Sequence, residues 1–547
     1  MKKDLLVILL LLILSIPALY ELFIPGGFTS HDLTHHVIRQ VSMDKLISDG
    51  QFPPRWSDDL NQGYGYPVFL FNYPLPALIG EGFHKMGLNF VDSVKAVLFL
   101  GLVLGVPGMY LFLKQLLKDD WVAVLGAMFF LYAPLRFLNT YVSAAVGSAL
   151  AMGIVPWVFL FILRISKGDR WAPILGGITL AFLILAHNVT TLIFFPVFLA
   201  FAGFLAWKNK KGILVMLALG LGLSAWFWIP AIIEKQYIKF DSIFNNFYQD
   251  QFPNIQQLIY SPWGYGLSHP MNPESGDMSY QIGLVHLLVI LVYGIWFIVY
   301  GRKSKNRALG IFVLGTFLLS IFMMTKLSLP LWDNLPVLAL VQFPLRFEAL
   351  TIFAASLASG LLLTHLPYKK ATFFVLLVLV LYANRNHWHI NKVFDPGDLY
   401  YQSLRTTSTT YSEHLPKWGS VRDKLSPGKF EFIRGNGNIT LDIDKSNYVL
   451  ANIEATDSGT LRFNQYYFPD WQIRIDNNLV KFNYLSDSES YGLPIFDVEK
   501  GKHKIEARFI NTKTRNLADL ISLITLTVCV TMILWMLLPR HMLLGKR

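Results

Sequence analysis

Three histidines and one aspartate lie close together near the N-terminus, and these residue types can carry out acid–base or metal chemistry. Asp32 stands between His31 and the pair His35 and His36 in residues 26–36, Gly-Gly-Phe-Thr-Ser-His-Asp-Leu-Thr-His-His. A carboxylate at a membrane surface could act as a general base, or bind a metal ion, facing a lipid-borne substrate. His31 and His35 would then line that substrate. Because His35 and His36 are adjacent, they do not share a helix face as the i, i+4 ligands of a zinc site do.

Asp32 could instead have a purely structural role. Apolar residues recur at intervals of four from Leu33 to Val41, which predicts a short helix along the membrane surface with Asp32 in its first turn. The helix dipole favours a carboxylate there, and Thr29 or Ser30 would be the cap. The residues alone leave both interpretations open.

The segment before Asp32 is a predicted membrane span. Residues 5–24 are apolar and long enough to cross ~30 Å of hydrocarbon. Glu21 and Pro25 stand where a signal peptide would have small residues, so we expect an anchor. The composition, 53% hydrophobic with a mean hydropathy of +0.43, is typical of a polytopic membrane protein.

We expect a polytopic α-helical membrane protein of about twelve spans. With the N-terminus in the cytoplasm, every predicted inner loop is basic, which accounts for the net charge of +11 without nucleic acid as a partner. Both termini are then cytoplasmic, and residues 25–93, 234–280 and 385–516 lie outside. The predicted spans are 5–24, 94–113, 121–138, 144–165, 172–187, 189–206, 213–233, 281–300, 308–326, 347–365, 371–384 and 517–539.

Three domains follow from this topology. Residues 1–384 form the transmembrane domain with its large outer loops, residues 385–516 form an extracytoplasmic domain, and residues 517–547 form a terminal anchor with a basic cytoplasmic tail. The middle domain is predicted to be an antiparallel β-sandwich, because short runs of alternating polarity are separated by turn signals. These runs are 448–454, 460–466, 471–476, 479–485 and 504–509.

Aromatic and polar residues of the outer loops are candidates to line a sugar substrate. Tyr64, Tyr66 and Asn72 fall in Gly-Tyr-Gly-Tyr-Pro and Phe-Asn-Tyr-Pro, and Trp263 and Tyr265 fall in the second outer loop. Flat amphipathic rings can stack on sugar faces, but they also form the aromatic belt at a membrane interface. Both interpretations stay open for each ring.

Three further residues could bind a phosphate. Arg346 opens a span in Gln-Phe-Pro-Leu-Arg-Phe-Glu, His187 lies between two spans, and Arg55 is in the first outer loop. A guanidinium can hold phosphate bidentately, or it can reach toward lipid headgroups, and His187 could simply end a helix. We expect Asp32, His187 and Arg346 to line one cavity at the outer membrane boundary, partly covered by residues 234–280.

Several standard chemistries have no motif in this chain. The sequence lacks a Walker A loop, Gly-x-Gly-x-x-Gly, His-Glu-x-x-His and Gly-x-Ser-x-Gly. The single cysteine, Cys529, excludes a disulfide within the chain and a cysteine-based metal site. Nucleotide hydrolysis and nucleic-acid binding are therefore not indicated.

Taken together, the motifs resemble the bacterial membrane proteins labelled 6-pyruvoyl-tetrahydropterin synthase-related, which are similar in turn to YfhO-like proteins of the type-C glycosyltransferase (GT-C) fold. The resemblance spans nearly all of the chain. It does not imply pterin chemistry, since a soluble pterin synthase holds zinc with three histidines in a small α/β fold. It rests on the early Asp-His run, Gly-Tyr-Gly-Tyr-Pro, Phe-Asn-Tyr-Pro-Leu-Pro, and residues 342–347, 413–418 and 466–471.

The resemblance implies a type-C scaffold that binds a polyprenyl-phosphate sugar and places an acidic residue of the first outer loop at the reaction centre. Asp32 matches that position. Relatives often read Tyr-x-Arg-Gly-Ala-x-x-Glu after the third span, whereas residues 141–148 read Tyr-Val-Ser-Ala-Ala-Val-Gly-Ser. Both charged residues, at Ser143 and Ser148, are missing, which points to altered specificity or reduced activity.

The function implied is an inverting glycosyltransferase on the outer face of a bacterial cytoplasmic membrane, working among membrane lipids. Asp32 would accept the proton of a glycan, glycolipid or protein acceptor, and Arg346, with Arg55 or His187, would offset the charge on the departing lipid phosphate. A divalent cation (Mg²⁺ or Mn²⁺), with Asp32 as a ligand, is compatible with this scheme but not required. The alternative is a non-catalytic membrane protein that translocates or organises glycolipid in envelope polysaccharide assembly.

Overall fold

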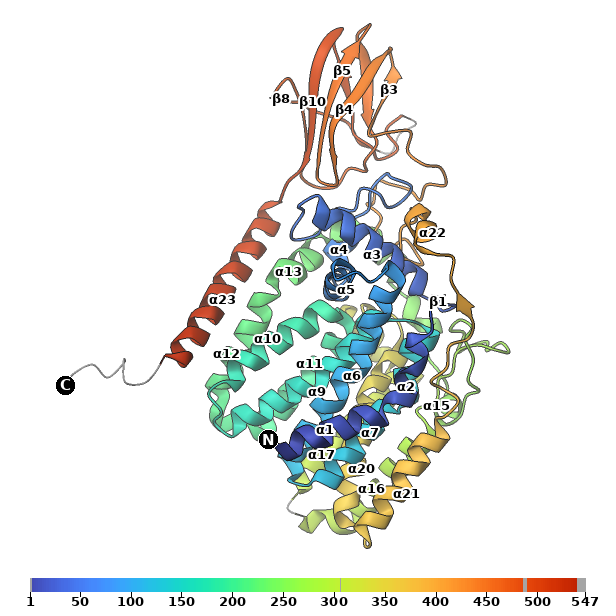
Figure 1. Cartoon of the computed structure of the whole chain (residues 1–547), viewed down its shortest axis with the longest axis vertical. Helices are drawn as coiled ribbons and strands as arrows, with labels where there is room; N and C mark the ends of the chain where they lie inside the picture. The colour runs from blue at the N-terminus through green and yellow to red at the C-terminus, as the bar shows by residue number, and fades with distance from the viewer. Residues whose placement is uncertain (1, 305, 486–488, 539–547) are drawn as a thin grey trace, which may run out of the picture.

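The computed structural model describes residues 2–304, 306–485 and 489–538. A body of packed helices carries a β domain at one end, and the C-terminal helix α23 stands against one side of the body (Figure 1). The described residues contain six helices long and apolar enough to cross a membrane, or up to nine if each of three bent pairs is one span. The basic tail expected at 540–547 lies outside the described residues.

Helices occupy all twelve segments in which the sequence predicts a span. Two of them, α10 and α16, are shorter than the six long helices, and α12 and α13 meet at a 69° bend, so the number twelve stays a prediction. The main helices in these segments are α1 (Lys2–Leu14), α6 (Phe90–Leu117), α7 (Asp120–Leu131), α9 (Val146–Ser166), α10 (Ala172–Ala186), α11 (Asn188–Leu205), α12 (Lys210–Leu223), α13 (Ala225–Ile233), α16 (Leu284–Tyr300), α17 (Arg307–Met324), α20 (Glu348–His365), α21 (Lys369–Ala383) and α23 (Lys513–Leu537).

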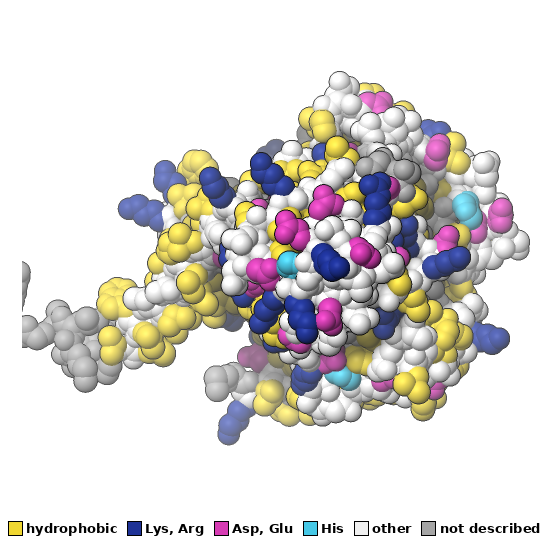
Figure 2. Space-filling view, turned by 90° about the horizontal axis from the view of Figure 1, so that it is seen from above, with side chains coloured by type: hydrophobic (Ala, Val, Ile, Leu, Met, Phe, Trp, Pro, Cys, Tyr) yellow, Lys and Arg dark blue, Asp and Glu magenta, His cyan; other side chains and the backbone are white. Residues whose placement is uncertain are grey.

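The centre of the body is formed by α9 and α20, whose apolar stretches are 89% and 94% buried. Close packing of α6 on α9 depends on glycine, because a Cβ added to Gly153 would lie 2.6 Å from the Gly101 carbonyl oxygen. By contrast, α23 is only 6% buried and exposes a row of leucines and valines. Seen from above, the β-domain end carries charges of both signs, whereas the arm that leads to the C-terminus is mostly hydrophobic (Figure 2).

The first outer segment folds into short elements at the junction of the body and the β domain. They are β1 (Gly27–Phe28), α3 (Leu33–Ser48), α4 (Val68–Phe71) and α5 (Leu75–Lys85). The apolar stripe correctly predicted α3, but Asp32 precedes the helix as its N-cap residue and is not in its first turn. The helix lies beneath the β domain, as Figure 1 shows.

The β domain contains two antiparallel sheets that share one hydrophobic core. One sheet has the order β4-β5-β10-β7-β8 and the other β3-β6-β9. Trp56 and Tyr66 of the first outer segment extend this core. The strands are β3 (Phe430–Arg434), β4 (Gly437–Lys445), β5 (Tyr448–Ala455), β6 (Gly459–Phe463), β7 (Trp471–Ile475), β8 (Asn478–Leu479), β9 (Ile495–Val498) and β10 (Gly501–Phe509).

The expected strand at 479–485 is wrong, since β8 ends at Leu479, and the sequence reading missed β3, β4 and β9. The signal for β4 was present, since Ile439, Leu441 and Ile443 alternate with polar residues, whereas β3 and β9 are short runs of five and four residues.

Residues before the first sheet do not belong to the sandwich. β2 (Val393–Phe394) pairs with β1, α22 (Asp398–Ser403) contacts α3, and residues 404–419 cross the first outer segment. There they meet the second outer loop, where Lys239 N donates to Leu415 O at 3.0 Å. All three outer segments therefore converge above the helical body. The remaining short helices are α2 (Ile16–Leu19), α4 (Val68–Phe71), α8 (Pro134–Phe137), α14 (Phe240–Phe244), α15 (Ile255–Ile259), α18 (Leu329–Asn334) and α19 (Pro336–Ala339).

Candidate active site at the head of α3

The Asp32 carboxylate stands at the N-cap of α3 without capping it. The helix start is closed instead by Ser30, whose Oγ accepts from Leu33 N at 3.1 Å. The backbone N–H of Asp32 donates to Ser143 O at 3.0 Å, which fixes the residue against the loop before α9. Within the described residues, the half-buried carboxylate makes no hydrogen bond and no ion pair. A carboxylate that neither caps nor pairs is free to accept a proton or hydrogen bond from a ligand.

His31 ties the second outer loop to this position. Its Nε2 lies 2.7 Å from Gly266 O, and its Nδ1 lies 3.3 Å from Ser143 Oγ. A carbonyl oxygen only accepts, so Nε2 donates to Gly266, and both ring nitrogens of His31 have a hydrogen-bond partner. The loop 234–280 therefore reaches the segment beside Asp32, as expected.

Tyr73 is the residue around which Asp32, His187 and Arg346 gather. Its ring meets the His187 ring edge-on, with centroids 4.9 Å apart. Burial raises the pKa of the Tyr73 phenol; the Asp32 charge adds to this rise, and the charges of Arg39 and Arg346 oppose it. One phenol thus contacts His187 and lies within electrostatic reach of Asp32 and Arg346. The packing needs glycine at position 147, where a Cβ would lie 2.3 Å from the Tyr73 ring.

Arg346 presents part of its guanidinium to this space. Nη1 donates to Val341 O at 2.8 Å and to Gln342 Oε1 at 2.9 Å, and the group lies over the Phe343 ring at 5.0 Å. Among the described residues, Nε and Nη2 have no hydrogen-bond acceptor. This half-buried cation therefore keeps two N–H directions open, which suits an oxyanion such as a phosphate.

His187 shows the helix-end arrangement that the sequence left open. Its Nδ1 accepts from Thr190 N at 3.0 Å and lies 2.8 Å from Thr190 Oγ1, so His187 caps α11. Its ring positions Tyr73, and its proposed contact with phosphate stays a prediction.

Glu413 is a functional candidate that the sequence reading missed. It raises the pKa of Tyr411 together with Asp32, after the larger effect of burial, and its Oε2 is buried without a hydrogen bond among the described residues. Its segment is held by Tyr66, whose Oη accepts from His414 N at 2.9 Å. Glu413 belongs to the family-like run Glu-His-Leu-Pro-Lys-Trp, but the sequence assigns residues 385–516 to a separate extracytoplasmic domain.

The two histidines of α3 are kept neutral by their surroundings. Burial and the Arg39 charge lower the pKa of His35, against the charges of Asp32 and Glu413, and burial holds the pKa of His36 well below its ordinary value. Arg39 itself donates from Nε to Ser408 O at 3.0 Å, which fastens residues 404–419 onto α3. The charged groups that influence Tyr73 and His35 are thus the carboxylates Asp32 and Glu413 and the guanidiniums Arg39 and Arg346.

An aromatic rim lies beside these charges. Tyr411, 46% exposed, contacts Phe244 and Phe247 with centroids 5.5 and 5.4 Å apart, and Phe247 contacts Phe343 at 5.2 Å. On the inner side, Asn72, Tyr73, His36 and Arg39 line a cavity of about 20 Å³, room for about one water. Asn72 therefore lies beside Tyr73, and its substrate contact stays a prediction.

Other predicted site residues have structural partners instead. Arg55, a predicted phosphate ligand, donates from Nη2 to Asp519 Oδ1 at 2.6 Å and from Nη1 to Asn511, which joins the first outer segment to α23. Its guanidinium is committed there because both ends of its fork find acceptors. These contacts give Arg55 a structural role, and its proposed contact with the donor phosphate stays a prediction.

The remaining aromatic candidates lie in packing contacts. Tyr64 stacks near Tyr466 with centroids 6.2 Å apart, and Tyr66 is buried under the 413–414 turn. Trp263 stacks on His387 at 4.3 Å, and Tyr265 Oη donates to His389 O at 2.7 Å. These four rings hold the outer segments together, and their substrate contact stays a prediction. The sequence could not separate the two roles because a ring used for packing and a ring used for stacking look alike.

A metal centre has no ligand cluster in the described part of the chain. No group of three or more His, Cys, Asp or Glu side chains could hold an ion there. A cation at Asp32 would need most of its ligands from water or substrate.

Comparison with known proteins now places the chain. Residues 71–390, more than half of its length, match the family described as "6-pyruvoyl-tetrahydropterin synthase related domain; membrane protein". The chain belongs to this family. A protein of Lactococcus lactis subsp. cremoris (strain MG1363), described as uncharacterized, is 25% identical over 240 residues, which is 41% of this chain and 39% of that protein. The chain thus spans about two fifths of the length of this relative.

Solved structures share a general arrangement with this family member. The apo oligosaccharyltransferase of Archaeoglobus fulgidus is 13% identical with a TM-score of 0.41, covering 76% of this chain and 61% of its own. ArnT from Cupriavidus metallidurans in the apo state is 16% identical with a TM-score of 0.36, covering 67% and 61%. Nothing about substrate or chemistry follows from likenesses of this size.

Proposed function

We propose that this protein is a membrane glycosyltransferase that moves a sugar from a polyprenyl-phosphate donor to a hydroxyl acceptor. The observation that carries the proposal is the Asp32 carboxylate, which stands at a helix start without capping it and is unpaired within the described residues. A base that must accept the acceptor's proton needs this freedom. The sequence resemblance to type-C enzymes, which place an acidic residue in the first outer loop, agrees with it.

The reaction balances with the groups at the head of α3. The acceptor oxygen bonds to the anomeric carbon as its proton passes to Asp32. The bond from that carbon to the phosphate oxygen breaks, and its electron pair leaves with the polyprenyl phosphate. Attack opposite the leaving group inverts the anomeric configuration. The open N–H groups of Arg346 stabilise the developing phosphate charge, and Tyr73 is placed to donate to the same oxygens.

Glu413 takes a second role in this scheme. Its buried, unpaired Oε2 can accept a hydrogen bond from a sugar hydroxyl or stabilise the positive charge that develops on the sugar ring. Asp32 comes from the first outer segment and Glu413 from the third, so the site is complete only when residues 404–419 are fastened onto α3 by Arg39.

The deciding experiment is a transfer assay with purified full-length protein in lipid nanodiscs. Radiolabelled polyprenyl-phosphate glucose and polyprenyl-phosphate mannose are the donors, and envelope glycolipids and glycans are the acceptors. We expect label to move to an acceptor with inversion at the anomeric carbon. If no donor is consumed, while proteoliposomes carrying the protein move the same lipid between leaflets, the non-catalytic alternative is correct and the proposal is wrong.

A further inference from the structure

A second and larger cavity lies further along α3, between the helix and the β domain. Its volume is about 420 Å³, within the usual range of ~300–1,000 Å³ for small-molecule sites. Three chain segments meet there: the middle of α3, the turn at 58–63 and the strands and turns of the third outer segment. The lining residues include Val41, Lys45, Asp59, Arg405, Lys429 and Asp444.

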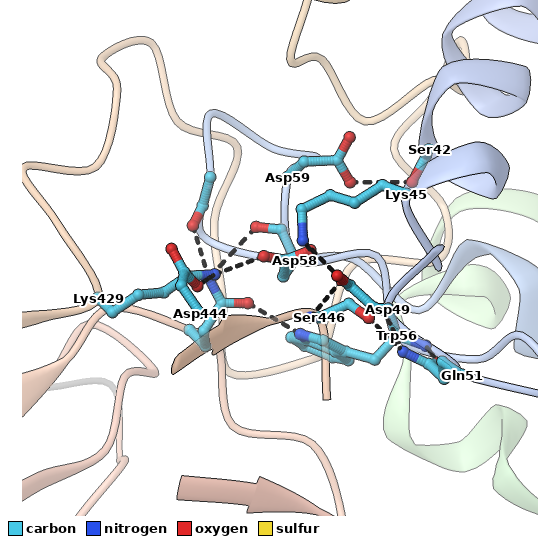
Figure 3. A network of polar contacts seen from close by, with 12 residues as sticks. Ser42, Lys45, Asp49, Gln51, Trp56, Asp58, Asp59, Lys429, Asp444 and Ser446 are labelled. Carbon is cyan, nitrogen blue, oxygen red and sulfur yellow. Dashed lines mark hydrogen bonds and ion pairs between the residues drawn. The ribbon is translucent and has the colours of Figure 1, made fainter. Parts of the chain in front are cut away.

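Most charges in this cleft neutralise one another. Asp58 contacts Lys45 at 3.1 Å and Lys429 at 2.5 Å, and Lys429 also lies 3.5 Å from Asp444 (Figure 3). Lys45 reaches Asp49 at 2.8 Å. Burial alone would raise the pKa of Asp58, but the charges of Lys429 and Lys45 outweigh burial and lower it, so the pairs are ionised. The walls thus offer little net charge to a ligand.

A few polar groups remain open to the cleft. Ser42 Oγ donates to one oxygen of Asp59 at 2.9 Å, and no described residue hydrogen-bonds to the other oxygen (Figure 3). The exposed Arg405 guanidinium has no hydrogen-bond or ion-pair partner in the described residues, and the Gln402 amide is exposed as well. The Asp59 carboxyl, the Arg405 guanidinium and the Gln402 amide therefore face the cleft.

Apolar surface lies next to these open groups. Val41, Phe90 and Leu441 all line the same cleft. A wall with both donors and acceptors, an apolar patch and nearly balanced charge fits a ligand with an apolar face and a rim of hydroxyls. Apart from Arg405 and Asp59, the charged side chains that line the cleft are already in ion pairs, so a ligand of either charge would meet few unpaired charges among the described residues.

We propose that this cleft binds a neutral oligosaccharide, the distal part of the acceptor whose end reacts at Asp32. This role as acceptor subsite rests on the proposed function. Two elements join the cleft to the reaction site. Along α3, the cleft residues Val41–Lys45 lie ~14–20 Å from Asp32 at 1.5 Å per residue. Along the third outer segment, Arg405 stands in the cleft and Tyr411 at the aromatic rim, six positions apart.

The test measures binding to the full-length protein in nanodiscs by fluorescence polarisation. The probes are labelled maltotetraose, cellotetraose and a galactose tetrasaccharide, with tetragalacturonic acid and chitosan tetramer as the acidic and cationic comparisons. We expect at least one neutral probe to bind better than both charged ones. Arg405→Ala and the pair Asp59→Ala with Gln402→Ala should each weaken this binding ~10-fold, the effect of losing one or two hydrogen bonds.

Control variants separate this inference from the proposed function. Arg474→Ala removes an exposed arginine on β7 outside the cleft and should bind like wild type. Asp32→Asn should also bind the neutral probe unchanged, so a chain with no transferase activity still tests the cleft. Binding of none of the neutral probes, preference for a charged probe, or full binding by the cleft variants would each overturn the inference. If transfer occurs but Arg405→Ala leaves the acceptor KM unchanged, the subsite role is wrong and the function stands.

Discussion

The two ends of α3 carry clusters of charge that differ in how completely their polar atoms are used. At the start, the Asp32 carboxylate, Glu413 Oε2 and two N–H groups of Arg346 have no partner among the described residues. At the end, Asp58 holds both Lys45 and Lys429. Burying an unpaired charged group costs more than burying a paired one, so the first cluster persists at a cost to stability. We therefore infer that polar atoms without a hydrogen-bond partner indicate a ligand site. The fully paired groups around Asp58 form a joint that holds α3 to the β domain.

The arginines repeat this contrast. Arg55 and Arg346 are both guanidinium groups in segments that the sequence predicts to lie at the membrane boundary, and the sequence proposes both as phosphate ligands. Arg55 places both ends of its fork on Asn511 and Asp519, while Arg346 keeps one edge open. Residue type does not distinguish them, but the number of free N–H groups does.

The strongest test of this comparison replaces one carboxylate oxygen by an amide nitrogen at each end of α3, in the variants Asp32→Asn and Asp58→Asn. Asp32→Asn keeps the size and the capping ability of the side chain and removes its basicity. We expect the transfer rate to fall ~10²–10⁴-fold, the usual effect of losing a general base, with the melting temperature within a degree or two of wild type. Initial rates and thermal unfolding in the same nanodiscs measure both quantities.

Asp58→Asn is the matched change in the paired cluster. It leaves Lys45 and Lys429 facing a neutral amide, so we expect a loss of about 1–3 kcal/mol in stability with an unchanged rate per folded molecule. The opposite result would be an Asp32→Asn protein that unfolds and an Asp58→Asn protein that is stable but inactive. That result would show that the presence or absence of a partner does not separate functional from structural polar atoms.

A second prediction concerns a different buried ion pair, which joins Glu234 to Arg515 at the start of α23. Glu234 Oε2 accepts from Arg515 Nε at 2.9 Å, and its Oε1 accepts from Thr512 Oγ1 at 2.6 Å, with both charged side chains almost fully buried. Glu234→Ala leaves the guanidinium unpaired and should destabilise the protein by ~3–5 kcal/mol. The double change Glu234→Ala with Arg515→Met should recover much of this loss in thermal unfolding. A double variant no more stable than the single one would contradict the pairing argument.

The two arginines give a third, smaller effect. Arg346→Lys keeps the charge and loses the planar fork, so we expect the donor KM to rise ~10-fold, equivalent to one lost charge-assisted hydrogen bond. Arg55→Lys should leave the donor KM unchanged and lower the melting temperature, because it loses the fork that joins the first outer segment to Asn511 and Asp519. Steady-state kinetics over donor concentration separate the two. If Arg55→Lys raises the donor KM and Arg346→Lys does not, Arg55 and not Arg346 binds the donor phosphate.

Much of the architecture follows from the sequence, because long apolar runs and alternating strands are local patterns. The apolar stripe predicts α3, and the turn signals locate β5, β6 and β7. The site was only half predictable. The positions of Asp32, His187 and Arg346 at span ends suggest them as candidates from the sequence, and their roles stay predictions. Glu413 comes near Asp32 through a fold-back of residues 404–419 onto α3 that no local pattern encodes. The partners of Arg55 were hidden for the same reason, since its acceptors lie more than 450 residues away in the chain.

Asp59 gives the finest test, because it stands beside the paired cluster but is not part of it. Burial and the charge of Asp58 raise its pKa from 3.8 to about 6, with Ser42 and Lys45 opposing the rise. Below pH ~4 the carboxyl is protonated in both the folded and unfolded chains, and its ionisation does not affect stability. Between pH ~4 and 6 the unfolded chain releases this proton while the folded chain keeps it, so stability falls as pH rises and stays lower above pH 6.

Asp59→Asn cannot ionise and keeps an oxygen for Ser42. We therefore expect it to be more stable than wild type at pH 7.5, by on the order of 1–3 kcal/mol, and equal to wild type at pH 4. Thermal unfolding of both proteins across pH 4–8 measures the difference, and Asp457→Asn, which changes an exposed carboxylate on the β domain, should show no such gain. An Asp59→Asn protein that loses stability at pH 7.5 would mean that Asp59 belongs to the paired joint after all. The open oxygen that we assign to a sugar hydroxyl would then be an unused part of that joint.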